Sequence, residues 1–221
     1  YSLSGDGVWS QVAFLKPANG QPYDYFGESV AISGDGNVIA VGAVDESSCM
    51  TAPVRVEDVD VTDNGCNHKG AVYLFNKVSG AWNATWVVKS PSDGTADEFG
   101  ISMSLSFDGS PLLVGAKEES SCSTTVANFQ IDADWFSNDD YCPSSGAAYG
   151  FALEPDSLDW YLQAYLKRDI NTNYADFGRW TSLSDDGATA GGGGAKGSPY
   201  LDAPNVNCFV FTRSSGNAWF L

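Results

Sequence analysis

Five cysteines carry the clearest chemical signal in this 221-residue chain, because their positions repeat. Cys49 and Cys122 each end an SSC run that follows VGAVDE or VGAKEE, and Cys66 and Cys142 each lie nine residues before the end of GAVYLF or GAAYGF. Matching positions in two similar segments predict the disulfides Cys49–Cys66 and Cys122–Cys142, which indicate an oxidising compartment. Cys208 has no partner in this scheme. It is either a small buried residue on a strand or half of an intermolecular disulfide.

Residues suited to catalysis are sparse. His68 is the one histidine in the sequence, so a Ser-His-Asp arrangement has no obvious candidate, and the GxSxG motif is absent. A zinc site would need a cluster of closely spaced Cys and His residues, and His68 is the one histidine available to such a cluster. Acidic pairs such as Glu118-Glu119 could in principle hydrolyse glycosides, but we interpret them as solvated loop residues. We therefore expect no enzymatic activity and no cofactor.

Two other features could contact other molecules. Asn83-Ala84-Thr85 is a sequon for N-linked glycosylation at the start of a tryptophan-containing strand. If that strand lies at an exposed outer edge, a glycan on Asn83 is plausible and would imply a eukaryotic secretory route. Trp135-Phe136 is an aromatic pair in a polar loop between two cysteines, so we interpret it as a candidate contact surface for a partner.

These residues lie between three copies of one long motif. The copies read YFGESVAISGDGNVIAVGA at 25–43, EFGISMSLSFDGSPLLVGA at 98–116 and DFGRWTSLSDDGATAGGGGA at 176–195. Alternating apolar residues, a Gly/Asp turn and an apolar run predict two strands joined by a hairpin in each copy. A polar excursion, a third strand and a strand that begins with Trp follow. Each repeat is thus four short strands with almost no helix signal.

A four-stranded sheet with two apolar faces must stack on neighbours, and a β-propeller repeats such sheets radially. We predict an all-β fold of propeller-like blades of four antiparallel strands, which is incomplete because three copies are fewer than the four blades that a propeller needs. A stacked or fibrous arrangement of the sheets is the alternative. The expected segments are an orphan strand of a preceding blade at 8–15 and repeats at about 17–89, 90–167 and 168–221.

The pattern FGxSVAxSxDGxxxxVGA, followed by GAxYxF and a Trp strand, resembles the FG-GAP repeat of integrin α subunits and other extracellular proteins. The resemblance implies a seven-bladed propeller. Calcium-binding members of that family carry a DxDxDGxxD loop. Here the three hairpin turns contain Asp35, Asp108 and Asp186 respectively, and each turn has only one or two carboxylates. Because calcium requires six to eight oxygen ligands, we interpret these residues as turn formers, with weak calcium binding as the alternative.

The net charge of −17 limits the partners. It argues against nucleic acid and against anionic membranes, since both require a basic face, and no apolar run is long enough to span a membrane. We expect a non-enzymatic extracellular or cell-surface module that binds other protein chains, including copies of itself, with glycans as a further class of partner. The first hypothesis is a subunit or fragment of a fibre or surface assembly. The alternative is a ligand-binding or adhesion domain of a receptor or of a multidomain enzyme.

Overall fold

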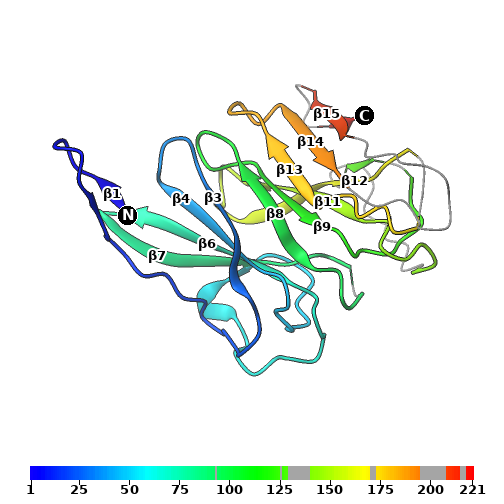
Figure 1. Ribbon diagram of the computed structural model, residues 1–221, viewed down its shortest axis with the longest axis horizontal. Helices are drawn as coiled ribbons and strands as arrows, with labels where there is room; N and C mark the ends of the chain where they lie inside the picture. Colours follow the sequence, from blue (N-terminus) through cyan, green and yellow to red (C-terminus); the bar gives the residue numbers. More distant parts are fainter. Residues whose placement is uncertain (93, 125, 129–139, 170–172, 195–207, 215–217) are drawn as a thin grey trace.

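The computed structural model describes residues 1–92, 94–124, 126–128, 140–169, 173–194, 208–214 and 218–221. Within these residues the chain forms strands and a single 3₁₀ turn at Val56–Asp58, and has no α-helix. Three antiparallel sheets lie side by side and do not close into a ring (Figure 1). This is a fragmentary propeller-like fold, and we call the sheets blade 1, blade 2 and blade 3.

Each blade has four principal strands in chain order from one edge of the sheet to the other. In the first two blades, a short fifth strand from the polar excursion pairs with the outer edge of the fourth strand. Blade 1 contains β3 (Phe26–Ile32), β4 (Val38–Ala43), β6 (Ala71–Val78), β7 (Ala81–Val88) and β5 (Val54–Arg55). Blade 2 contains β8 (Phe99–Leu105), β9 (Leu112–Ala116), β11 (Ala147–Leu153), β12 (Trp160–Leu166) and β10 (Ala127–Asn128). Blade 3 contains β13 (Trp180–Leu183), β14 (Thr189–Gly193), β15 (Cys208–Arg213) and β16 (Trp219–Phe220).

Two hydrophobic cores hold the blades together. Leu74 and Val88 of blade 1 pack with Phe99 and Tyr149 of blade 2 in the first core. In the second core, Leu113 of blade 2 and its neighbours pack with the phenylalanines and tryptophan of blade 3. The second and third strands of the first two blades are buried on both faces, as their continuous apolar runs predict.

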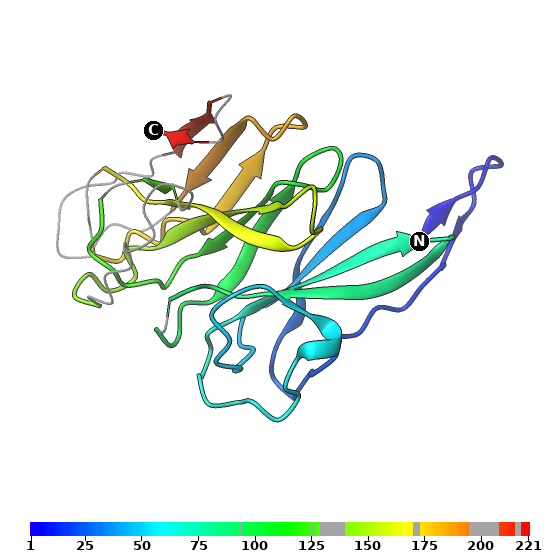
Figure 2. The same cartoon turned by 180° about the vertical axis from the view of Figure 1, so that it is seen from behind.

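The N-terminal strand is much shorter than the 8–15 span predicted from sequence. Only Trp9–Ser10 (β2) is a strand, and it pairs with Ser2–Leu3 (β1) in a small hairpin that stands away from the blades (Figure 2). Trp9 and Phe14 are exposed. The alternating sequence alone does not make a strand here, because no strand of the described structure pairs with residues 11–15, although Leu15 packs against the core of blade 1.

Candidate functional site

The Phe-Gly dipeptide of each motif lies at the joint between two blades. Phe99 forms a parallel β-bridge with Gly70, and Phe177 forms the equivalent bridge with Gly146. The amide of Phe99 donates to the carbonyl of Lys69 at 3.2 Å, and the amide of Phe177 repeats this bond to Ser145. The motif is therefore the point at which one blade attaches to the strand before it.

Paired glycines let the backbones meet at these joints. Gly100 and Gly178 have φ of +94° and +86°, which few other residues adopt. A Cβ atom on Gly42 would lie 2.3 Å from the carbonyl oxygen of Gly100, and one on Gly115 would lie 1.8 Å from that of Gly178. The glycine of each VGA run is thus required for contact with the Phe-Gly glycine of the next blade.

A serine three residues after each phenylalanine completes the joint in the first two blades. Ser29 donates its hydroxyl to the carbonyl oxygen of Gly100 at 2.5 Å, and Ser102 donates to that of Gly178 at 2.7 Å. In blade 3 the equivalent position is Trp180, which is 53% exposed. The third blade therefore presents a different face to whatever lies beyond it.

Blade 1 has an open face, which we call the leading face. It is the side of β3 equivalent to the side of β8 by which blade 2 packs on blade 1. Val30 and Ile32 are 63% and 58% exposed there, and a Cβ on Gly27 would meet no atom of the described residues within 4 Å. Gly27 still has φ of +97°, so the joint geometry is present without an occupant in the described residues.

Blade 3 has the complementary open face, which we call the trailing face. Trp180, Val210 and Phe220 are more than half exposed on it. Cys208 is also exposed, so our interpretation of it as a small buried residue is wrong. The register of β15 places Cys208 where Val72 lies in blade 1, a core position that is buried only when another blade covers it.

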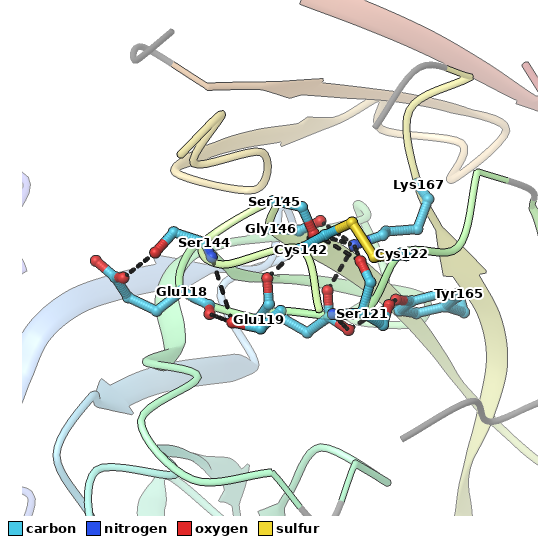
Figure 3. Close-up of polar contacts among 11 residues, drawn as sticks. Glu118, Glu119, Ser121, Cys122, Cys142, Ser144, Ser145, Gly146, Tyr165 and Lys167 are labelled. Carbon is cyan, nitrogen blue, oxygen red and sulfur yellow. Dashed lines mark hydrogen bonds and ion pairs between the residues drawn. A yellow bond between two sulfur atoms is a disulfide. The ribbon is translucent and has the colours of Figure 1, made fainter. Parts of the chain in front are cut away.

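A second set of polar residues anchors the excursions to the blades. In blade 2 the ammonium of Lys167, at the end of β12, lies 2.6 Å from Glu119 Oε2 and contacts Ser145 Oγ and the carbonyl oxygens of Ser121 and Gly146 (Figure 3). The pair is almost fully buried. The hydroxyl of Tyr165 donates to Glu119 Oε1 at 2.9 Å, and burial raises the pKa of this tyrosine. Together these contacts join the start and end of the excursion to the sheet.

Blade 1 contains an equivalent buried Lys–Glu pair with different hydrogen-bonding neighbours. Lys89 pairs with Glu46 inside the protein, while Asn19 donates to Glu46 Oε1 at 2.8 Å and accepts a hydrogen bond from the Tyr73 hydroxyl at 2.7 Å. Burial lowers the pKa of Lys89. We call the two clusters the Lys–Glu nodes.

The nodes correct one interpretation and reveal residues that sequence reasoning missed. Glu119 is buried and ion-paired, so its interpretation as a solvated loop acid is wrong, whereas its neighbour Glu118 is only partly buried and accepts from Ser144 at 2.6 Å. The sequence does show the residues of the nodes in both copies. A glutamate is the third residue after each VGA run, and a lysine directly follows each Trp strand. Lys16 occupies the same position after the Trp9 segment, but is exposed.

Disulfides close the excursions beside the nodes. Cys49 is bonded to Cys66 and Cys122 to Cys142, as the repeated spacing predicts. The amide of Cys142 also donates to the carbonyl of Ser120 at 3.0 Å. Each bridge closes a loop of roughly 17–20 residues, worth about 3 kcal/mol in the chain-entropy model.

Comparison with known families agrees with the geometry of the first blade. Residues 9–75 match the model of the FG-GAP repeat. The chain contains an FG-GAP repeat. The match ends at Phe75, in the third strand of blade 1. No curated protein sequence matches the chain. FG-GAP repeats and disulfides are typical of extracellular proteins, and the described residues include no helix that could cross a membrane.

The turn aspartates of the FG-GAP motif are held by their own turns. Asp35 accepts from the Ser33 hydroxyl at 2.6 Å and the Asn37 amide at 3.0 Å. Asp108 and Asp186 each accept from a hydroxyl and an amide in the same way. These bonds lower the pKa of Asp35, and the bond from the Ser33 hydroxyl has the largest effect. The hydrogen bonds of the three aspartates are thus those of turn formers. Among the described residues, no group of three or more acidic, His or Cys side chains could hold a metal ion.

The remaining candidates divide between described and undescribed parts of the chain. Asn83 is exposed on β7, ahead of the part of that strand which β5 covers. Trp135 and Phe136 lie outside the described residues. Asn83 thus has the exposure that glycosylation requires, and its modification stays a prediction.

One buried carboxyl lies at the joint between the first two blades. Burial raises the pKa of Asp97 to about 7, and the negative charges of Glu119 and Asp140 act in the same direction, whereas the Ser92 hydroxyl and the charge of Lys69 oppose it. The ordinary value is 3.8. Between these two values the folded protein holds a proton that the unfolded chain has released.

Folding stability should therefore fall as the pH rises from about 4 to 7 through this residue. Relative to the Asp97→Asn variant, the wild type should lose about 2–4 kcal/mol of unfolding free energy between pH 4 and pH 8. Urea unfolding of both proteins across this range measures the difference. A difference that is the same at every pH would contradict the raised pKa.

Proposed function

We propose that this chain is a non-enzymatic extracellular structural module that joins other blades through its leading and trailing faces, chiefly those of further copies of itself. The observation that carries the proposal is the pair of open faces. The joint between blades 1 and 2 recurs between blades 2 and 3, so one type of contact is used twice within the chain. At the leading end Gly27 keeps the backbone geometry of this contact, and at the trailing end Trp180 replaces the joint serine on an apolar face; both faces are uncovered in the described structure.

The chemistry of the two faces suits this contact. The leading face offers the positive-φ Gly27 and the apolar Val30 and Ile32, while the trailing face offers Trp180 and Val210. Joining them would remove large exposed apolar side chains from water, the main driving force of association. Because one end of the chain binds the opposite end of the next copy, the contact is heterologous and builds a ring or a filament.

Charge on the leading face should prevent assembly without unfolding the blades. Val30→Asp combined with Ile32→Lys changes two exposed side chains, so we expect unaltered thermal unfolding and a monomer mass of 23.4 kDa, against larger species for the wild type. Analytical ultracentrifugation and electron microscopy measure this.

Val61→Asp is the matched control, because Val61 is 52% exposed on the first excursion and belongs neither to β3 nor to blade 3. It should assemble like the wild type. A wild type that stays monomeric at all concentrations tested, or a double variant that assembles as well as the wild type, would refute the proposal.

A further inference from the structure

A pocket of about 290 Å³ opens between the outer halves of blades 1 and 2. Blade 1 contributes Asn76, Thr85 and Trp86, and blade 2 contributes Ser110 and Trp160. This volume is at the lower end of the range for small-molecule sites. The pocket is therefore large enough for one or two rings.

The register of blade 1 places Asn83 beside this pocket. Asn83 pairs directly with Asn76 across β6 and β7. Directly opposed residues of an antiparallel pair lie on the same face of the sheet, with Cβ atoms about 4.5–5.5 Å apart. Asn76 lines the pocket, so Asn83 leaves the sheet on the pocket side.

We propose that Asn83 carries an N-linked glycan and that this pocket seats its first N-acetylglucosamine. The amide nitrogen of Asn83 bonds to C1 of the sugar of a lipid diphosphate-linked oligosaccharide. The bond between C1 and the lipid diphosphate breaks, and the amide proton passes to a base of the transferase. The first ring then lies within reach of Asn76 and Thr85.

The lining of the pocket suits this sugar. Trp86 and Trp160 belong to the first core and are each 8% exposed, and Arg55 lies over the Trp86 ring at 4.6 Å. The small part of each indole that lines the pocket can contact the apolar face of a pyranose ring. Asp108 accepts its two hydrogen bonds from within the described residues at Oδ1, so Oδ2 can accept from a sugar hydroxyl or from the acetamido group.

The state of Thr85 fixes when the modification occurs. In the folded blade its hydroxyl lies 3.1 Å from the Leu74 carbonyl oxygen and 2.6 Å from Asn76 Oδ1. The transferase reads this hydroxyl as part of the sequon, so the sugar is added before β6 and β7 pair. The pocket then forms around a ring that is already attached.

The test compares three forms of the protein secreted from a eukaryotic host with high-mannose glycans. These are the intact glycoprotein, the same protein trimmed to one N-acetylglucosamine by endoglycosidase H, and the Asn83→Gln variant. Mass spectrometry should find the glycan on Asn83. The first two forms should melt at the same temperature, about 2–4 °C above Asn83→Gln, because the first ring carries the contact.

The matched control moves the sugar to the opposite face of the same hairpin. Lys77→Asn in the Asn83→Gln background creates a sequon with Ser79 at an exposed residue whose neighbours Tyr73 and Phe75 on the same face pack away from blade 2. Its single trimmed sugar should give no stabilisation. Leu158→Ala, at a 58% exposed pocket residue, should reduce the sugar's effect and leave the melting of Asn83→Gln unchanged.

Two outcomes would overturn the proposal. One is the absence of glycan on Asn83 in the secreted protein. The other is a trimmed sugar at residue 77 that stabilises as much as one at residue 83. All forms are made in the Val30→Asp, Ile32→Lys background, so both readouts are independent of whether the open faces assemble.

Discussion

Replacing Lys167 with methionine is expected to lower the free energy of unfolding by about 3–5 kcal/mol. The methionine side chain nearly fills the same space, but Glu119 is left buried without its cation, beside the Tyr165 hydroxyl and the Ser121 amide. A lone buried carboxylate is far more costly than a paired one. Urea unfolding at pH 7, followed by tryptophan fluorescence, measures the loss.

Lys16→Met is the matched control, because Lys16 holds the same sequence position after the Trp9 segment but is exposed. Its effect should stay within about 0.5 kcal/mol of zero. The double variant Lys167→Met with Glu119→Gln should regain part of the loss, since it removes both charges. Equal losses for Lys167→Met and Lys16→Met would show that the node contributes little to stability.

The node also shows why some of the site was hidden in the sequence. Strand positions followed from local patterns: Phe26–Ile32 is a strand in the first half of the 25–43 motif, and Trp160–Leu166 is a strand that begins with Trp, both as predicted. Whether Glu119 is solvated depends instead on Lys167, 48 residues away in sequence, which lies at the end of another strand. A buried ion pair is thus a property of tertiary contact, visible in the sequence only as matching Glu and Lys positions in two copies.

Exposure at the two ends of the blade series was equally beyond local patterns. The alternating run at 8–15 and the apolar run around Cys208 both carry strand signals. Burial of such residues requires a neighbouring sheet, and in the described structure none covers Phe14 or Val210. The disulfides were predictable because matching positions in two repeats are a non-local signal that the sequence does display.

A methyl group at Gly115 should open the joint between blades 2 and 3. The Cβ of Gly115→Ala would lie 1.8 Å from the carbonyl oxygen of Gly178 and 2.5 Å from Ser102 Oγ. Gly178 is itself fixed by the bridge between Phe177 and Gly146, so its carbonyl cannot move away without breaking that joint. We expect a loss of about 3 kcal/mol, measured by thermal and urea unfolding.

The loss should be local, which separates a broken joint from general misfolding. Hydrogen exchange should rise in β13 and β14, which hold to blade 2 through this contact and the second core, and stay low in β4 and β6. Gly191→Ala is the control, since a Cβ there has its nearest neighbour at 4.0 Å and the strand conformation suits alanine. If Gly115→Ala leaves exchange in blade 3 unchanged, glycine pairing does not hold the blades together. The proposed joining of copies through the same geometry would then lose its basis.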